Sequence, residues 1–343
     1  NSSSDIQFTT GSVALTVSGS LTNDGTLEFT GTAADVTLQG NVTNNGTLTL
    51  PIIDDSDVET SLISFTGGSS QTVTTTAFEV ESVTINKNAA QNVEITSSPN
   101  GAIRIAERLT FASTNTSGAN LATDGAIVLS SGARLVYGTG EIVDPSNTNA
   151  SGAIYAEQNI GDFSGIRVNW YMLGNPGGST YNDILNNSDL GNNTLWTQGV
   201  SGSNAPGASP NVFKFNGDSA SGSTLNNGWE AWTSTTTTPE GFMVFAFRDD
   251  NFDGTVSKEE DWVKTIETKA ENLNFGETTV NLEYGDDGTT NAGWNLIGNP
   301  YFNDIKVSNL LDDTSNDVQG SAYIWDPDLS SATSSGNDGH QVS

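Results

Sequence analysis

One stretch of the chain has the residue types and the spacing of a calcium-binding loop. Residues 249–260 read DDNFDGTVSKEE, and this run matches the twelve-residue pattern D-x-[DN]-x-[DN]-G-x₅-E at every specified position. Oxygen ligands converge as such a backbone coils, and the central glycine permits the sharp turn. The predicted Ca²⁺ ligands are Asp249, Asn251, Asp253, Thr255 through its carbonyl, Ser257 through a water molecule, and Glu260 as a bidentate carboxylate.

The segments on either side of this loop differ from those of a helix-loop-helix calcium site. Residues 242–247, FMVFAF, read as a buried strand, whereas Glu259 to Lys269 could begin a helix. We therefore expect a calcium loop placed between β elements, with a structural role and without the opening motion of a sensor. The alternative is an exposed turn without metal, because Asp, Asn and Gly cluster in such turns.

Candidate catalytic residues are few. The single histidine, His340, lies in a polar tail, so a Ser-His-Asp triad would need this tail to fold back onto a nucleophile. Arg104, Arg108 and Arg134 invite comparison with polysaccharide lyases, but no acidic cluster accompanies them in the sequence, and their stems are expected to cover apolar surface. No pair of carboxylates is singled out for glycoside hydrolysis. We expect no catalytic centre.

Charge and composition restrict the class of protein further. The chain has 11 Lys and Arg against 41 Asp and Glu, a net charge of -30, which repels nucleic acid and anionic membrane surfaces. It has no cysteine, which excludes disulfides and thiolate metal sites. No apolar run approaches the roughly 20 residues needed to span a bilayer. The polar start at Asn1 is not a signal peptide, so we expect that an export signal has already been removed.

The first part of the chain contains an internal repeat. Residues 17–29, VSGSLTNDGTLEF, align with residues 38–50, LQGNVTNNGTLTL, at an offset of 21, and every apolar residue and glycine coincides. The apolar residues alternate, so one face of each short strand points inward, and the Asn-Asp-Gly or Asn-Asn-Gly run is predicted to supply the positive φ that turns the corner. A period near 20 fits one turn of a β-solenoid.

Later apolar segments continue this style with looser spacing as far as residue 129. They predict about six or seven coils and a rod on the order of 30 Å long, at about 4.8 Å per coil. The alternative for this half is a β-sandwich with similar hairpins.

The second half has a different pattern, and we place the boundary near residue 150. Trp170 to Pro176, WYMLGNP, recurs as Trp294 to Pro300, WNLIGNP. In each copy an apolar strand is expected to end at Gly-Asn-Pro, where proline blocks further pairing. The apolar segments between the copies predict an antiparallel β-sandwich; they are residues 212–215, 229–232 and 241–247.

Three tryptophans of this half, Trp196, Trp229 and Trp232, lie in or near its loops, and aromatic faces bind sugar rings. Trp229 and Trp232 are three residues apart, so on a strand they would face opposite sides and could not form one platform. We expect most of the tryptophans to pack in the core.

Several of these segments resemble a known class of exported protein. The run 64–73, SFTGGSSQTV, with the later 83–86, VTIN, and 109–111, LTF, resembles the repetitive β-helical regions of large surface proteins exported by the type IX secretion system of Bacteroidetes-type bacteria. The duplicated Trp and Gly-Asn-Pro strand and the run 323–326, YIWD, resemble the domain that follows these regions. The resemblance covers about residues 60–327 and implies a secreted or outer-surface location. It also implies further strands and a sorting domain beyond Ser343, so we expect the chain to be part of a longer precursor.

The sequence thus predicts an all-β protein with an N-terminal β-solenoid, or β-helix, over residues 1–150. An antiparallel β-sandwich with an internal duplication and an inserted calcium loop is predicted over residues 151–343. The expected function is that of a structural or adhesive surface protein that binds copies of itself or other surface proteins, in a fibre or layer. The alternatives are a module that binds surface glycans and, less favoured, a polysaccharide-degrading enzyme. Nucleic acid and transmembrane segments are not expected.

Overall fold

A computed structural model shows an all-β protein, with strands β1 to β25 and no complete helix among the residues that it describes. Compact packing divides the chain into two units: unit 1 comprises Asn1–Asn159, Asn187–Thr194 and Thr265–Phe275, and unit 2 comprises Ile160–Asn186, Leu195–Lys264 and Gly276–Ser343. The described residues are 5–52, 60–87, 91–96, 102–112, 120–136, 142–144, 147–162, 170–174, 198–199, 209–217, 228–232, 241–247, 255, 263–270, 279–280, 282, 294–302, 305, 307, 322–325 and 339–342.

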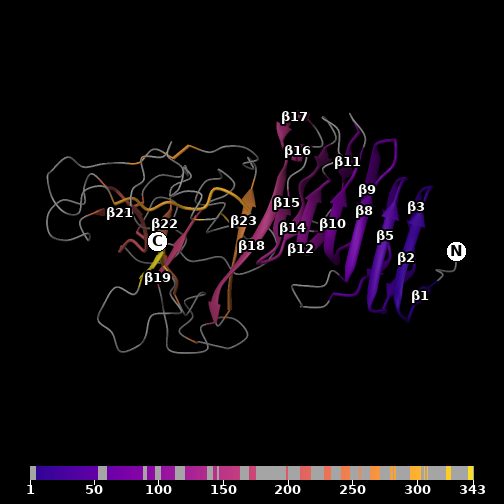
Figure 1. Ribbon diagram of the computed structural model, residues 1–343, viewed down its shortest axis with the longest axis horizontal. Coiled ribbons are helices and arrows are strands. Elements are labelled where there is room, and N and C mark those ends of the chain that lie inside the picture. The colour runs from indigo at the N-terminus through magenta and orange to yellow at the C-terminus, as the bar shows by residue number, and fades with distance from the viewer. Residues whose placement is uncertain are drawn as a thin grey trace. The chain divides into compact units, whose positions relative to one another are not determined.

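Unit 1 is a β-solenoid whose strands stack into three sheets (Figure 1). Sheet A has the order β1 (Ile6–Phe8), β4 (Thr26–Phe29), β7 (Thr47–Thr49). Sheet B has the order β2 (Ser12–Val17), β5 (Ala33–Leu38), β8 (Ser61–Phe65), β10 (Phe78–Ile85), β12 (Ile103–Phe111), β14 (Asp124–Leu129), β18 (Ala153–Asp162), β23 (Val263–Ala270), with β15 (Arg134–Val136) also beside β12. Sheet C has the order β17 (Asn147–Ser151), β16 (Ile142–Asp144), β13 (Leu121–Ala122), β11 (Val93–Ile95), β9 (Gln71–Thr75), β6 (Val42–Asn44), β3 (Leu21–Asn23).

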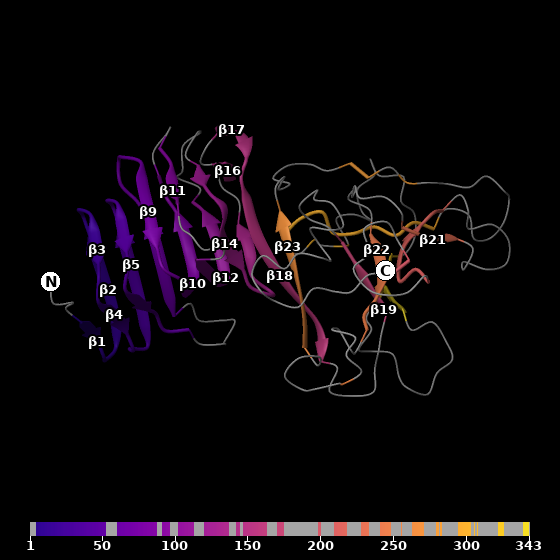
Figure 2. The ribbon, with the colours of Figure 1, turned by 180° about the vertical axis from the view of Figure 1, so that it is seen from behind.

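The register of the strands confirms that the sequence repeat is one turn of the solenoid. In sheet B, Ser12 of β2 lies opposite Ala33 of β5, and in sheet C Asn23 of β3 lies opposite Asn44 of β6, a separation of 21 residues. The pairing is parallel, as stacking of successive turns requires. Figure 2 shows strands β3, β9 and β11 of sheet C in this order along the stack, and β6 lies between β3 and β9.

The interior of the solenoid is built from rows of apolar side chains, one residue per coil. Each row occupies the inward position of sheet B, where alternate residues of a strand point to the same face. From the second coil onward these side chains are almost fully buried. The two rows are Leu15, Val36, Ile63, Val83, Leu109, Leu135 and Val17, Leu38, Phe65, Ile85, Phe111.

The solenoid has about five turns, fewer than the six or seven that the sequence predicts. Several apolar segments that read as separate coils are in fact parts of one strand. Ile103–Phe111 is continuous, and its first half lies beside β14 while its second half lies beside β15. β10 is similarly long, with an irregularity between Val80 and Ser82 where its register shifts.

Glycines at the corners are needed for close approach between coils, and the positive φ predicted for the Asn-Asp-Gly and Asn-Asn-Gly corners is not found at their glycines. Neither Gly25 nor Gly46 is among the described glycines with positive φ. A Cβ on Gly46 would instead overlap the carbonyl oxygen of Gly25 in the preceding coil. At the corner between β5 and β6, a Cβ on Gly40 would likewise overlap the backbone of Gly19. The missing side chain therefore matters more here than backbone freedom.

Strands of opposite direction lie at the end of sheets B and C away from β2 and β3. β17 pairs antiparallel with β16 at one end of sheet C, and β23 follows β18 in sheet B with the opposite direction (Figure 1). The expectation of a helix beginning within Glu259 to Lys269 is wrong, because Val263–Ala270 is a strand. Its alternate residues Ile266, Thr268 and Ala270 are buried, which is the period of a strand.

Unit 2 contains a four-stranded antiparallel sheet, here called sheet D. A hairpin of β24 (Ala322–Trp325) and β25 (Gly339–Val342) is also described. The described residues do not confirm a second layer facing sheet D, so the sandwich is not established. The strand order of sheet D is β19 (Trp170–Leu173), β22 (Phe242–Phe245), β20 (Val212–Phe215), β21 (Trp229–Ala231).

The two copies of the Gly-Asn-Pro motif meet each other within unit 2. A Cβ on Gly174 would lie 2.7 Å from the backbone nitrogen of Asn299, and one on Gly298 would lie 2.6 Å from Cα of Gly174. The first copy follows a strand, as predicted. The second does not, because residues 294–296 are not in a strand and Ile297 forms only an isolated bridge. The repeated glycines therefore serve close backbone packing.

Candidate functional site

The predicted calcium ligands lie outside the described residues, with the exception of Thr255, which is exposed. These are Asp249, Asn251, Asp253, Ser257 and Glu260. Within the described part of the chain no group of three or more His, Asp or Glu side chains is arranged to hold a metal ion.

The candidate catalytic residues are spread over different strands. His340 lies in β25 with its backbone opposite Ile324 of β24. Arg108 and Arg134 occupy neighbouring strands in register, and Arg108 lies 3.8 Å from the carboxylate of Glu107 on its own strand. No two of these residues are brought together with a nucleophile among the described contacts.

Arg104 forms an ion pair with Glu157 of β18 that sequence reasoning missed. The glutamate side chain is 8% exposed and the arginine side chain 33% exposed, so the pair lies at the surface of the solenoid wall. The two residues are 53 positions apart, and only the stacking of coils brings them together. The pair of one arginine and one buried carboxylate links strands β12 and β18.

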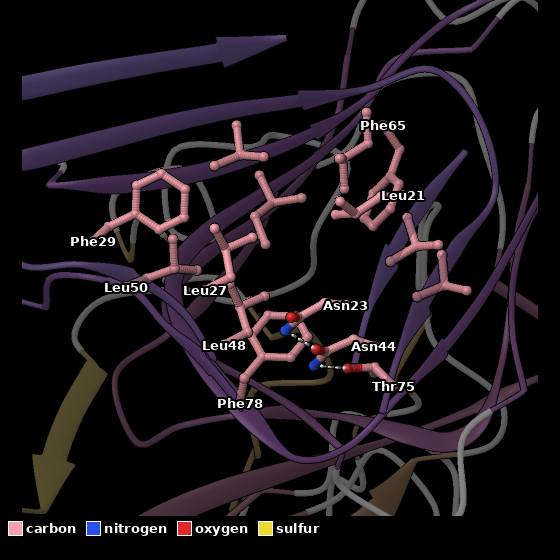
Figure 3. A pocket seen from close by; sticks show the side chains of 15 residues that line it. Leu21, Asn23, Leu27, Phe29, Asn44, Leu48, Leu50, Phe65, Thr75 and Phe78 are labelled. Carbon is pink, nitrogen blue, oxygen red and sulfur yellow. Dashed lines mark hydrogen bonds between the residues drawn. The ribbon is translucent and has the colours of Figure 1, made fainter. Parts of the chain in front are cut away.

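A row of buried amide and hydroxyl groups runs along the interior at the C-terminal ends of strands β3, β6 and β9 of sheet C (Figure 3). Asn23 donates from Nδ2 to Oδ1 of Asn44 at 2.7 Å, and Asn44 donates to Oγ1 of Thr75 at 3.0 Å. Asn23 also donates to the carbonyl of Thr47 and accepts from the backbone N–H of Gly25. In the sequence, this row is visible only as the alignment of Asn23 with Asn44 in the two repeats. The structure shows that these side chains hold successive coils together, since each buried amide bonds to a residue of the next turn.

The space beside this row is apolar and small. The cavity measures about 20 Å³ and is bounded by aliphatic and phenyl side chains with the Asn and Thr groups at one wall. Figure 3 shows Leu27, Phe29, Leu50 and Phe65 among the side chains around it. A space of this size holds at most one water molecule. The interior of the first coils is therefore a packed core with no room for a substrate.

Two charged side chains are buried where coils join. The carboxylate of Glu81 accepts hydrogen bonds from the backbone and hydroxyl of Thr60 and from the N–H of Ser61 at 3.1 Å. Lys87 donates from Nζ to the carbonyls of Thr66 at 2.6 Å and Ser69 at 2.9 Å. Burial lowers the pKa of Lys87 from its usual 10.5 to about 8. Glu81 ties strand β10 to the start of β8, and Lys87 ties the segment after β10 to the segment after β8.

Hydroxyl-bearing side chains form rows on the outer surface of the solenoid. In sheet C, Thr22, Thr43 and Thr74 lie in register, and the hydroxyl of Thr74 lies 3.1 Å from that of Thr96. A second row follows the outward position of sheet B. It consists of Thr16, Thr37, Ser64, Thr84 and Thr110.

The first coil is the least covered part of the solenoid. Strands β1, β2 and β3 are the outermost strands of sheets A, B and C on this side. Ile6 of β1 is 54% exposed, and the inward side chains of Val13, Leu15 and Val17 are half-buried. In the next coil the corresponding Ala34, Val36 and Leu38 are buried.

One face of sheet D is aromatic and half-buried. The rings of Trp170 and Phe245, which lie opposite each other, are 5.1 Å apart, and Phe215 and Trp229 are also 5.1 Å apart. We call this surface, formed by Trp170, Phe213, Phe215, Trp229 and Phe245, the aromatic face. The opposite face carries exposed Lys214 and half-buried Glu230, and its apolar side chains are buried; these are Tyr171, Val212, Trp232, Phe242 and Val244.

The prediction for the tryptophan pair is confirmed. Trp229 is half-exposed on the aromatic face, whereas Trp232 is buried and its ring lies 5.1 Å from that of Phe242. Trp196 lies outside the described residues.

Comparison with known proteins gives no relative. No protein-family model, no curated protein and no solved structure matches the chain. In the described portion, no helix has the length and apolar character to cross a membrane.

Proposed function

We propose that the chain is a non-catalytic structural or adhesive protein of a bacterial outer surface, with the solenoid as its scaffold. The observation that supports this best is the coil-on-coil stacking of the sheets around a closely packed interior. Apolar rows, the Asn23–Asn44–Thr75 hydrogen bonds and the Arg104–Glu157 ion pair all join one turn to another. Contacts of this kind stiffen a repeat protein along its stacking direction.

The proposed location rests on the sequence. The runs SFTGGSSQTV at 64–73 and YIWD at 323–326 resemble exported surface proteins, which implies a route through the type IX secretion system. The large negative charge suits an extracellular medium in which salt screens self-repulsion.

We assign two finer features to unit 2 as part of the same proposal. Sheet D is one layer of a β-sandwich, because its two faces differ in burial: Tyr171, Val212 and Val244 are buried on one face, whereas the aromatic face is half-buried. The loop 249–260 binds Ca²⁺ through the ligands predicted from its sequence and stabilises the connection between β22 and β23.

The test is attachment of the purified chain, immobilised on beads, to cells and extracellular matrix of the producing bacterium. Retention of the beads, with surface polysaccharides left chemically intact, is the expected result. Release of reducing or unsaturated sugar ends would contradict a non-catalytic role. Beads that bind neither cells, matrix nor purified surface proteins would contradict an adhesive one.

A second candidate function is carbohydrate binding, and the aromatic face favours it. Half-exposed Trp170 and Trp229 offer ring surface of the kind that sugars stack on. A glycan array decides between the two. If the face binds sugar, Trp229→Ala lowers retention of a bound glycan while the melting temperature changes little. Binding that is unaffected by this substitution would exclude the aromatic face as the site.

A further inference from the structure

The outer edge of β2 presents unpaired backbone groups. The carbonyls of Gly11 and Val17 accept hydrogen bonds from Thr32 and Gln39 in the next coil, both at 3.0 Å. Backbone groups of odd-numbered residues therefore face β5, since they alternate along a strand. The N–H and C=O groups of the even-numbered residues 12, 14 and 16 face away from it. No strand pairs with this edge in the part of the chain that the structure describes.

This edge also lacks the usual protection against pairing. Natural edge strands carry Lys, Pro or a bulge that prevents a further strand from adding. β2 reads SVALTV, without charge, proline or glycine, and the first Lys or Arg of the whole chain is Lys87. By contrast β23, the last strand of sheet B, carries Lys269, which lies 3.4 Å from Asp124. A short uncharged strand of high β propensity is an association site.

We propose that a second copy of this chain covers the edge, with the two β2 strands antiparallel about a two-fold axis at Leu15. The proposal rests on the structural role proposed above and specifies its first assembly contact. It extends sheet B continuously from one chain into the other. A two-fold contact of this kind is closed, so it produces a dimer.

The sequence of β2 is self-complementary in this register. Leu15 faces Leu15 of the second copy, and Val13 faces its Val17, so half-buried inward side chains cover one another. Ala14 and Thr16 of opposite copies form the hydrogen-bonded pairs, because their backbone groups point outward from β5. A register centred one residue earlier would use Gly11, which has left the strand with φ of 69°.

Mass measurement on the whole chain tests the dimer. Light scattering after size exclusion, over a concentration series, is expected to give twice the mass of one chain. Thr16→Lys puts a charge on the edge without altering the interior, and it is expected to give a monomer. Thr37→Lys is the matched control, because it makes the same change in the same outward row one coil further in; it should remain dimeric. A monomeric wild-type chain, or equal behaviour of the two variants, would overturn the proposal.

A crosslink tests the register. The chain has no cysteine, so Leu15→Cys introduces a single thiol. Opposite residues of a non-hydrogen-bonded antiparallel pair have Cα atoms about 4.5 Å apart, which is within disulfide range. Oxidation is expected to link Leu15→Cys into covalent dimers and to leave Thr37→Cys unlinked. Absence of the crosslink in the first variant would refute the register. A monomeric chain that still attaches in the bead assay would overturn the dimer alone and leave the adhesive function standing.

Discussion

Single side chains inside the solenoid connect one coil to the next by hydrogen bonds as well as by apolar contact. Asn44 is the central member, since it accepts from Asn23 and donates to Thr75. A buried polar group without its partner costs more than the bond itself contributes, so such a row also enforces register. Glu81 and Lys87 act in the same way with backbone groups of the neighbouring turn.

Replacement of Asn44 by alanine should destabilise the protein. It removes the buried acceptor of one Asn23 hydrogen bond and the buried donor to the Thr75 hydroxyl, at a cost of about 1–3 kcal/mol. Asn45→Ala is the control, because the neighbouring Asn45 bonds to Asp24 at the surface; it should change the free energy of unfolding by less than about 0.5 kcal/mol. Urea denaturation measures both, and equal effects would show that the buried row carries no stability.

Lys87 should give the protein a measurable pH dependence in alkaline solution. Its pKa is about 8 in the folded chain and 10.5 in the unfolded chain. Between these values the unfolded state binds the extra proton, so the contribution of Lys87 to stability rises with pH and is lost as pH falls through 8. The difference in unfolding free energy between wild type and Lys87→Met should therefore grow in favour of wild type from pH 8 to 10.5. A constant difference would refute the shift.

At the scale of elements, the corner glycines set how closely consecutive turns can stack. Gly19 and Gly40 occupy the same corner in successive coils, but only Gly40 has a coil on the side where a Cβ would point. Glycine is therefore required at position 40 but not at the equivalent position 19. The requirement depends on whether another coil lies beside the residue, which the local sequence does not reveal.

These two glycines give a matched pair of substitutions. Gly40→Ala forces a methyl group into the backbone of Gly19 and should destabilise by about 1–3 kcal/mol, the usual range for overpacking. Gly19→Ala meets nothing within 4 Å and should stay within about 0.5 kcal/mol of wild type. Thermal unfolding of the two variants measures the difference. Similar losses for both would mean that backbone freedom, and not coil contact, explains the glycines.

Sequence reasoning succeeded where one strand pattern repeats at constant spacing. The alignment of Asn23 with Asn44 predicted the register of the first coils because each turn there has the same length. It failed where one long strand pairs with two different strands, as Ile103–Phe111 does with β14 and β15, since two apolar segments look the same whether one strand or two contain them. It also misread Val263–Ala270, whose strand form depends on a neighbour far earlier in the chain, β18. Arg104 and Glu157 could not be paired without knowing the coil lengths between them.

At the scale of the whole molecule, the chain combines a stacked scaffold with a separate unit built on antiparallel strands. Neither unit, in its described residues, gathers the ionisable groups of a catalytic site. What the scaffold offers instead is long regular surface, with rows of hydroxyls outside and the unprotected edge of β2. The proposed calcium loop would add stability to the second unit.

Calcium should raise the thermal stability of the metal-stripped protein. Ligand that binds only the folded state adds RT ln(1 + [L]/Kd), about 2.7 kcal/mol at a hundredfold excess over Kd. Glu260→Gln removes the bidentate ligand and should abolish most of this gain, while magnesium should substitute poorly. Calorimetry with and without millimolar Ca²⁺ is the measurement. An unchanged melting temperature would refute the proposal that residues 249–260 bind Ca²⁺.

The stacking of coils is tested most directly by a distance between two spin labels on the solenoid wall. Thr37 and Val136 share the outward row of sheet B and are separated by four strand steps, through Ser64, Thr84 and Thr110. At about 4.8 Å per step their backbones should lie about 19 Å apart. Cysteines at these two positions, labelled in the otherwise cysteine-free chain, should give one narrow distance distribution near that value by pulsed electron spin resonance. A broad distribution, or one centred at twice that distance, would contradict a stacked solenoid.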